Sequence, residues 1–139
     1  MHILDYAAVA IISLTGIYFV GLGVSALVVP ARTAAFLESF AGSAFAHYLE
    51  MSLRLVVGFA LLRFASQMPI SIAFTVFGWL IVGTTACLLL MPWQWHQKFA
   101  QRTVPQVLSY LKLVAAVSIA LGIAFLTAAV YTLVYPNPS

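Results

Sequence analysis

Charged side chains are scarce in this chain. Six Lys or Arg and three Asp or Glu make up 6% of its 139 residues, whereas 64% of the residues are hydrophobic. A water-soluble domain usually carries about 25% charged residues, so this chain cannot cover a globule with polar groups. The net charge of +3 is small and its bases are scattered along the chain, which argues against a nucleic-acid partner.

Side chains that carry chemistry are equally rare. The single cysteine, Cys87, excludes an internal disulfide and a cysteine metal site. His2, His47 and His96 are far apart in the sequence and have no carboxylate pair beside them, so we expect no bound metal and no cofactor. The chain has neither a Gly-x-Ser-x-Gly elbow nor a glycine-rich phosphate loop. These absences predict a protein without enzymatic activity.

Long apolar runs are what the chain has instead. Each run is long enough to cross a hydrocarbon core ~30 Å thick as a helix that rises about 1.5 Å per residue. Within lipid, a helix satisfies its backbone hydrogen bonds internally. We therefore predict an all-α fold, a four-helix transmembrane bundle that forms one integral membrane domain over residues 1–139. The predicted spans are residues 6–29, 48–65, 69–91 and 106–135.

Prolines mark the ends of the first and third spans. Pro30 and Pro92 cannot continue a helical hydrogen-bond ladder, and the segments after them are less apolar. Each segment has aromatic residues four positions apart among polar ones, which is typical of an amphipathic helix on a membrane surface. We expect such interfacial helices within residues 31–46 and 93–104, and we expect Pro105 to begin the fourth span. The aromatic pairs are Phe36 with Phe40 and Trp95 with Phe99.

The two halves of the sequence are similar. Three positions of the first half recur 62 residues later, and the tetrapeptide at 53–56 (Leu-Arg-Leu-Val) aligns with Leu-Lys-Leu-Val at 111–114, a shift of 58 residues. This pattern predicts a tandem repeat of two spans, related by a two-fold axis along the membrane normal. Chance agreement among common membrane residues is the alternative. The recurring positions are Gly16, Gly21 and Pro30, which return as Gly78, Gly83 and Pro92.

The distribution of basic residues predicts how the chain is oriented. Most bases lie on the side of the two long connections, while Arg63 lies near the short turn on the other side. The positive-inside rule then places the long connections in the cytoplasm and both termini in the periplasm of a bacterial inner membrane. The bases on the connection side are Arg32, Arg54, Lys98, Arg102 and Lys112.

Glu50 and Arg54 are the first candidates for a binding site. They are four residues apart on one helix and can form an ion pair. A charge inside a span costs roughly 3 kcal/mol, so Arg54 marks either a function or a base that reaches back to the interface. In the repeat Arg54 aligns with Lys112, and we expect the two bases at matching depths. There they could bind a phosphate or carboxylate, such as an anionic lipid headgroup.

Small residues predict where helices pack closely. Gly21 with Ser25 and Gly83 with Cys87 are pairs four residues apart, so each pair forms a small face in its half of the chain. Gly16 lies five residues before Gly21, and Gly78 lies five residues before Gly83. Each is about 140° around the helix from that glycine and so belongs to a separate face. We expect tight packing inside the molecule at these faces rather than a dimer contact. The predicted packing residues are Gly16, Gly21, Ser25, Gly78, Gly83 and Cys87.

One part of the chain resembles a known group. The glycine-rich first span, the break at Pro30-Ala31-Arg32 and the returning Leu53-Arg54 with Gly58 resemble small four-span bacterial inner-membrane proteins, many of them of unknown function. The resemblance covers about the first 90 residues. It implies a membrane location and brings no activity, so no catalytic residue can be transferred from it.

These features favour two functions. The first is a non-enzymatic accessory or scaffold subunit, which contacts the lipid bilayer and binds other membrane subunits or further copies of itself. The second is a small oligomeric transporter or channel for an anionic or amphipathic solute, with Glu50, Arg54 and Lys112 along the route. An enzyme that acts on lipid is a third possibility, but its reactive group would have to come from a substrate or a partner.

Overall fold

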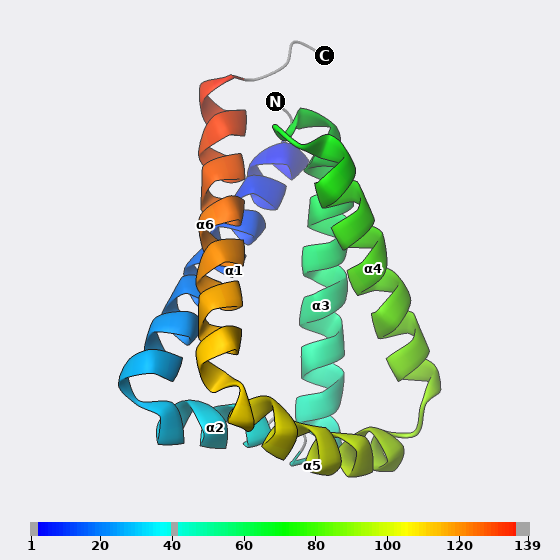
Figure 1. The fold of residues 1–139 in the computed structure, drawn as a ribbon. Coiled ribbons are helices and arrows are strands. Elements are labelled where there is room, and N and C mark those ends of the chain that lie inside the picture. The colour runs from blue at the N-terminus through cyan, green and yellow to red at the C-terminus, as the bar shows by residue number, and fades with distance from the viewer. Residues whose placement is uncertain (1–2, 40–41, 136–139) are drawn as a thin grey trace.

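The computed structural model describes residues 3–39 and 42–135, and all regular structure in these residues is helical. The all-α fold predicted from the sequence is confirmed. Figure 1 shows four long helices side by side and two shorter helices across one end. The long helices are α1 (Ile3–Val28), α3 (Ala44–Phe64), α4 (Ser71–Leu90) and α6 (Leu111–Val134), the shorter ones are α2 (Pro30–Ser39) and α5 (Trp93–Ser109), and the one-turn 3₁₀ helix η1 (Ala65–Gln67) follows α3.

The four long helices of the described chain are long and apolar enough to cross a membrane. Their most apolar windows have mean hydropathies of 2.1, 1.4, 2.0 and 2.5 in chain order, with α3 counted together with η1. The shortest, α4, has 20 residues and extends ~30 Å, which matches the hydrocarbon core of a bilayer. The chain is therefore a multi-pass membrane protein.

The predicted bounds of the first three spans lie within four residues of the observed helices, but the fourth span was predicted to start five residues too early. Helix α5 continues through Pro105 to Ser109, and α6 begins only at Leu111. The corner lies at Tyr110, whose backbone (φ −109°, ψ 27°) leaves the helical region. The prediction that Pro105 begins the fourth span is wrong because a proline inside a helix removes one hydrogen bond without necessarily ending the helix.

The remaining boundaries follow from local chemistry. Helix α1 ends before Pro30 and α4 ends before Pro92, because the residue preceding a proline is disfavoured in the helical conformation. Helix α3 begins after Ser43, whose side chain accepts a hydrogen bond of 3.2 Å from the backbone N–H of Ala46. Such a cap satisfies one of the backbone donors that a helix start leaves open. Phe40, which we expected in the first interfacial helix, lies outside the described residues.

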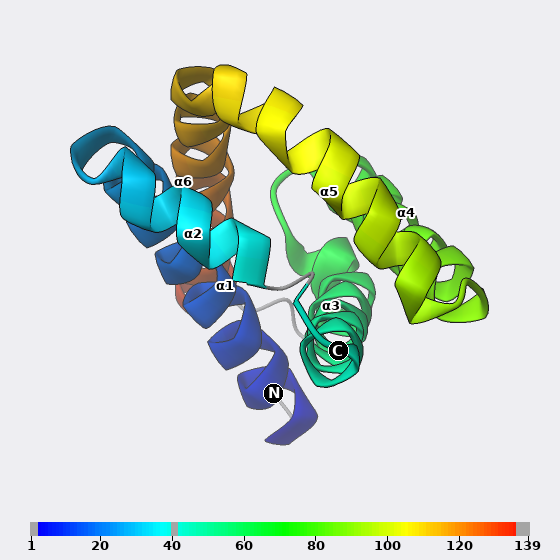
Figure 2. The ribbon, with the colours of Figure 1, turned by 90° about the horizontal axis from the view of Figure 1, so that it is seen from below.

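Helices α2 and α5 lie across the same end of the molecule, which we call the connecting end (Figures 1 and 2). The start of α1, the end of α6 and the turn between α3 and α4 lie at the opposite end, which we call the terminal end. In the view of Figure 2, α2 passes from α1 towards α3, and α5 passes from α4 to α6. Each short helix therefore links one long helix to another across the connecting end.

The long helices pack as two pairs. Helix α1 packs along α6, and α3 packs along α4. The pairs meet in the terminal half, where Phe125 of α6 is 2% exposed and its ring lies 6.0 Å from that of Phe74 and 5.8 Å from that of Phe77, both on α4. Towards the connecting end the pairs spread apart (Figure 1). The shared core of the described chain therefore lies in the terminal half, with Ile12, Leu61 and Phe64 among its fully buried side chains.

Each pair has a close glycine crossing. A Cβ atom added to Gly122 of α6 would lie 2.7 Å from the carbonyl oxygen of Gly16 on α1. In the other pair, a Cβ added to Gly78 of α4 would lie 3.3 Å from the carbonyl oxygen of Gly58 on α3. Backbones that approach this closely gain van der Waals contact, which drives helix association where lipid removes the hydrophobic effect.

Candidate functional site

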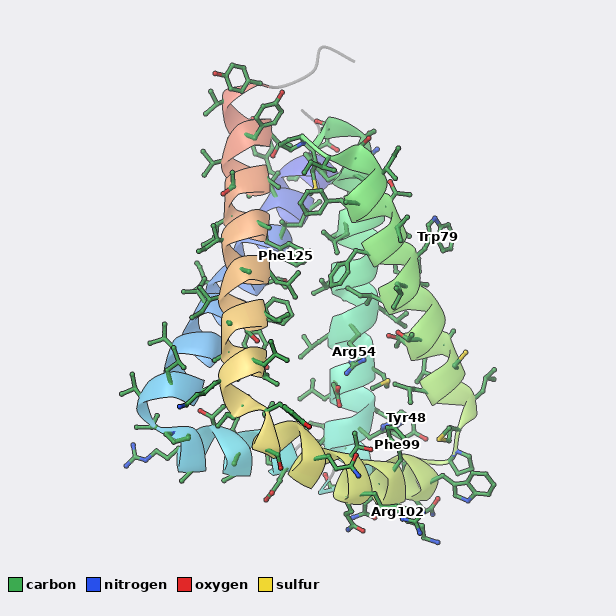
Figure 3. All side chains as sticks on the ribbon, in the orientation of Figure 1. Tyr48, Arg54, Trp79, Phe99, Arg102 and Phe125 are labelled. Carbon is green, nitrogen blue, oxygen red and sulfur yellow. The ribbon has the colours of Figure 1, made fainter. Side chains whose placement is uncertain are left out.

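The ion pair predicted between Glu50 and Arg54 is present near the middle of α3. Arg54 Nε donates a hydrogen bond of 2.9 Å to Glu50 Oε1, and Arg54 Nη2 lies 2.6 Å from the same oxygen. Arg54 is the eleventh of the 21 residues of α3, and Figure 3 shows it about halfway along the helix. An intramembrane charge is expensive and usually functional. The carboxylate neutralises it here, while 44% of the Arg54 side chain stays exposed.

Tyr18 of α1 adds a third polar group to this pair. It lies within electrostatic range of both Glu50 and Arg54, although it belongs to the other pair of helices. Tyr18 is 45% exposed. Sequence analysis missed Tyr18, although its position was a signal. Aromatic residues of interfacial belts lie at the ends of spans, whereas Tyr18 lies ten residues before the end of α1. We call Tyr18, Glu50 and Arg54 the mid-span cluster.

Lys112 lies elsewhere. It is the second residue of α6 and lies at the connecting end, whereas Arg54 lies ten residues, ~15 Å, beyond the start of α3. The two bases therefore occupy different positions along their helices, and their matching depth stays a prediction from the sequence. Residues 106–109 belong to α5, so the fourth span starts later than the predicted residue 106.

A second ion pair lies at the terminal end. Arg63 Nη2 of α3 lies 3.0 Å from Asp5 Oδ1, in the first turn of α1. The Asp5 side chain is buried (8% exposed), while that of Arg63 is half exposed. The pair ties the start of α1 to the end of α3. Sequence reasoning placed Arg63 on the same side of the membrane as the N-terminus but could not pair it with Asp5, because nothing in their spacing brings the two helices together.

The charged residues outside the two ion pairs all lie at the connecting end, and they account for the whole net charge of the chain. Asp5 cancels Arg63 and Glu50 cancels Arg54, so the other five of the nine charged residues set the balance. Four bases minus one acid give +3, which equals the net charge of the chain. These residues are Arg32 and Glu38 in α2, Lys98 and Arg102 in α5, and Lys112 at the start of α6.

The predicted packing residues differ in what surrounds them. Gly16 and Gly78 lie in the close crossings described above. At Gly21 and Gly83, an added Cβ would meet no atom within 4 Å, so the expectation of tight packing inside the molecule is not met at these two positions. Ser25 shares a hydrogen bond of 2.9 Å with Thr33 of α2, and Cys87 is exposed. Gly58 and Gly122 also lie in close contacts, and sequence analysis did not predict either as a packing residue.

The structure also places one of the histidines. His47 is 2% exposed near the start of α3, and its ring lies 5.1 Å from the ring of Tyr48. Within residues 3–39 and 42–135, no three His, Cys, Asp or Glu side chains come together in a way that could hold a metal ion. The described groups that can act on a ligand are thus the mid-span cluster and the bases of the connecting end.

Comparisons with protein-family models, with curated proteins and with solved structures returned no match. The resemblance to small four-span bacterial inner-membrane proteins therefore stays a prediction from the sequence. A function has to be argued from the helices and the residues described above.

Proposed function

We propose that this membrane protein is a non-enzymatic accessory or scaffold subunit that binds a helix of a larger membrane assembly along α4. The proposal rests on how little of α4 the molecule itself covers. The span window of α4 is 11% buried, compared with 28–33% for the other three windows. The buried residues of α4 are Gly78 and Thr85, on the side towards α3.

A glycine at the centre of the outward face of α4 carries the proposal. Gly83 lies five residues after Gly78 and therefore about 140° around the helix from the α3 contact. An added Cβ at Gly83 would meet no atom within 4 Å. Trp79 and Cys87, each four residues away, are exposed on the same face, and Figure 3 shows Trp79 pointing away from the other helices. Helices associate in lipid where a small residue lets backbones approach, so this face suits a partner helix.

Cys87 provides a direct test because it is the single cysteine of the chain. Native membranes are treated with a maleimide that carries a photoreactive benzophenone, and the labelled protein is irradiated and analysed by mass. We expect a covalent adduct of defined mass with another polypeptide or with a second copy of this chain. The proposal fails if Cys87 yields lipid adducts alone.

Two variants of α4 control the test. Gly83→Leu fills the outward face, and we expect it to abolish the protein adduct at Cys87. Thr84→Leu adds bulk to the next residue, about 100° around the helix. The Thr84 hydroxyl donates hydrogen bonds within its own helix, to the carbonyl oxygens of Leu80 (2.7 Å) and Ile81 (3.1 Å). This variant should therefore keep the adduct. Equal loss in both variants would contradict the role of the glycine face.

The charge distribution supports the proposed orientation. The net charge of +3 lies at the connecting end, and the terminal end carries a neutral ion pair. Bases are retained on the cytoplasmic side of bacterial membranes. We therefore place α2 and α5 at the cytoplasmic face of a bacterial inner membrane, with both termini on the periplasmic side.

Transport of an anionic or amphipathic solute is the second candidate, and the mid-span cluster favours it. Arg54 lies in the middle of a span, is 44% exposed, and lies within electrostatic range of Tyr18 on the other helix pair. Release of carboxyfluorescein from liposomes that contain the protein tests this function. The double variant Glu50→Gln with Arg54→Leu removes both charges together, so no lone charge is left in the membrane. Release that is equal for the wild type and the double variant would rule out this route.

A further inference from the structure

A pocket of ≈ 610 Å³ lies at the corner where α1 and α2 meet the junction of α5 and α6. Leu27 near the end of α1 and Pro30 at the start of α2 form one wall. The other wall is the chain from Ser109 to Leu113, which turns from α5 into α6. This pocket is separate from the mid-span cluster and from the outward face of α4.

The lining of this corner pocket is polar on one part and apolar on another. The polar residues of the lining are Lys112, which is exposed, and Ser109 and Tyr110, whose side chains carry hydroxyl groups. Leu27 and Leu113 contribute apolar surface and are 54% and 62% exposed. An ammonium beside hydroxyl donors suits a phosphate, since hydrogen bonds to ionised groups are about twice as strong as neutral ones. Exposed leucines at the end of a span suit the first methylene groups of an acyl chain.

The depth of the pocket matches the boundary between headgroups and hydrocarbon. Its residues include the last turn of α1 and the first turn of α6, where two spans leave the apolar core. It also lies at the connecting end, where the chain holds its entire net charge of +3. Basic pockets between transmembrane helices at this level bind anionic lipid headgroups.

We propose that the corner pocket binds one anionic phospholipid, with its phosphate on Lys112 and Tyr110 and the upper part of an acyl chain against Leu27 and Leu113. A water-soluble phosphate would use only the polar part of the lining and leave the leucine wall uncovered. The lipid uses both parts, so its affinity depends on the charge of Lys112 and on the open space beside Leu113.

Native mass spectrometry of the purified protein tests this proposal with phosphatidylglycerol as the anionic probe and phosphatidylcholine as the zwitterionic control. We expect the wild type to retain one phosphatidylglycerol and to bind it at least ~10-fold more tightly than phosphatidylcholine, because the choline cation would lie beside the positive charge of Lys112. Millimolar glycerol 3-phosphate should fail to displace the lipid. Displacement by this soluble phosphate, or equal retention of both lipids, would overturn the proposal.

Matched variants separate a specific pocket from general attraction to a basic surface. Lys112→Gln and Lys98→Gln each remove one positive charge at the connecting end, but Lys98 lies on α5 and does not line the corner pocket. We expect Lys112→Gln to weaken phosphatidylglycerol binding roughly 10-fold and Lys98→Gln to leave it nearly unchanged. Equal effects of the two variants would show that net charge alone attracts the lipid and would contradict the proposal.

Leu113→Trp tests the apolar part of the pocket without a change of charge. Because Leu113 is 62% exposed, the larger ring can be accommodated without disturbing the packing of α6, and retained helical content by circular dichroism would verify the fold. The indole should occupy the space of the acyl chain and lower lipid retention. Unchanged retention in this variant would refute the acyl-chain contact. Binding at α4 is read at Cys87, so failure of either proposal leaves the other standing.

Discussion

A single methyl group at residue 122 would collide with the backbone of α1. An added Cβ there would lie 2.7 Å from the carbonyl oxygen of Gly16 and 2.8 Å from the amide nitrogen of Val20. Backbone atoms cannot rotate away as a flexible side chain can, so α1 and α6 would have to separate. The contact that joins these two helices therefore depends on the absence of a side chain at this position.

We expect Gly122→Ala to destabilise the protein by about 1–3 kcal/mol, as overpacking of a close contact does. Gly21→Ala is the matched control, since an added Cβ at Gly21 would meet no atom within 4 Å. Both variants can be measured by thermal unfolding in the same detergent, with circular dichroism as the readout. If Gly21→Ala is as destabilising as Gly122→Ala, the observed helix crossing is not what holds α1 and α6 together.

Sequence spacing predicted some residue contacts and missed others for a physical reason. Glu50 and Arg54 could be paired because the geometry of one helix brings residues four apart together. The ion pair of Asp5 with Arg63 joins two different helices. Tyr18 likewise lies on a different helix from Glu50 and Arg54. Such contacts depend on how helices are placed in space, and no local spacing encodes that placement.

At the scale of single elements, α5 shows how an amphipathic helix is arranged at the connecting end. Four residues of α5 fall within about 100° of one another around the helix and so share one face. They are Trp95, Lys98, Phe99 and Arg102, which line a shallow pocket of ≈ 380 Å³. Trp95 and Phe99 are 65% and 63% exposed, and Figure 3 shows Phe99 and Arg102 on α5 below the long helices. The aromatic rings form one edge of the face and the bases form the other.

This arrangement predicts that α5 lies flat in the interface, with its aromatic edge in the acyl region and its basic edge among the headgroups. Nitroxide labels at neighbouring positions test this after Cys87→Ala. We expect the label at Phe99→Cys to be more accessible to oxygen and the label at Lys98→Cys to be more accessible to a water-soluble nickel complex. Equal accessibility of the two labels would mean that α5 extends into water.

The ends of elements were predictable where prolines mark them. Helices α1 and α4 end next to Pro30 and Pro92, as expected. The corner between α5 and α6 was not predictable, since Tyr110 is not a residue that breaks helices and Pro105 gave a misleading signal. This corner arises because α5 runs across the end of the molecule and the chain has to turn to enter the membrane.

At the scale of the whole molecule, the charge distribution predicts which end faces the cytoplasm. The net charge of +3 lies at the connecting end, so Ser66 near the α3–α4 turn should be periplasmic and Gln101 of α5 cytoplasmic. In a Cys87→Ala background, a membrane-impermeant maleimide should label Ser66→Cys in intact bacterial spheroplasts and should label Gln101→Cys only after lysis. Labelling of Gln101→Cys before lysis, without labelling of Ser66→Cys, would invert the proposed orientation.

The number of long apolar helices could be read from the sequence, but the order in which they pack could not. Helices α1, α4 and α6 are apolar on all sides, because lipid and protein neighbours are equally apolar surroundings. No polar face therefore tells which side meets another helix. The pairing of α1 with α6 and of α3 with α4 depends on close glycine crossings, and glycines such as Gly21 and Gly83 carry the same local signature without any such contact.

The spread of the two helix pairs away from the terminal end has a mechanical consequence for the surrounding lipid. Because the pairs converge at the terminal end and diverge towards α2 and α5 (Figure 1), the molecule is wider at the connecting end than at the terminal end. A tapered inclusion of this kind relieves stress where a bilayer curves towards its narrow side, and it costs more in a flat sheet. Local membrane shape would then influence where this protein accumulates.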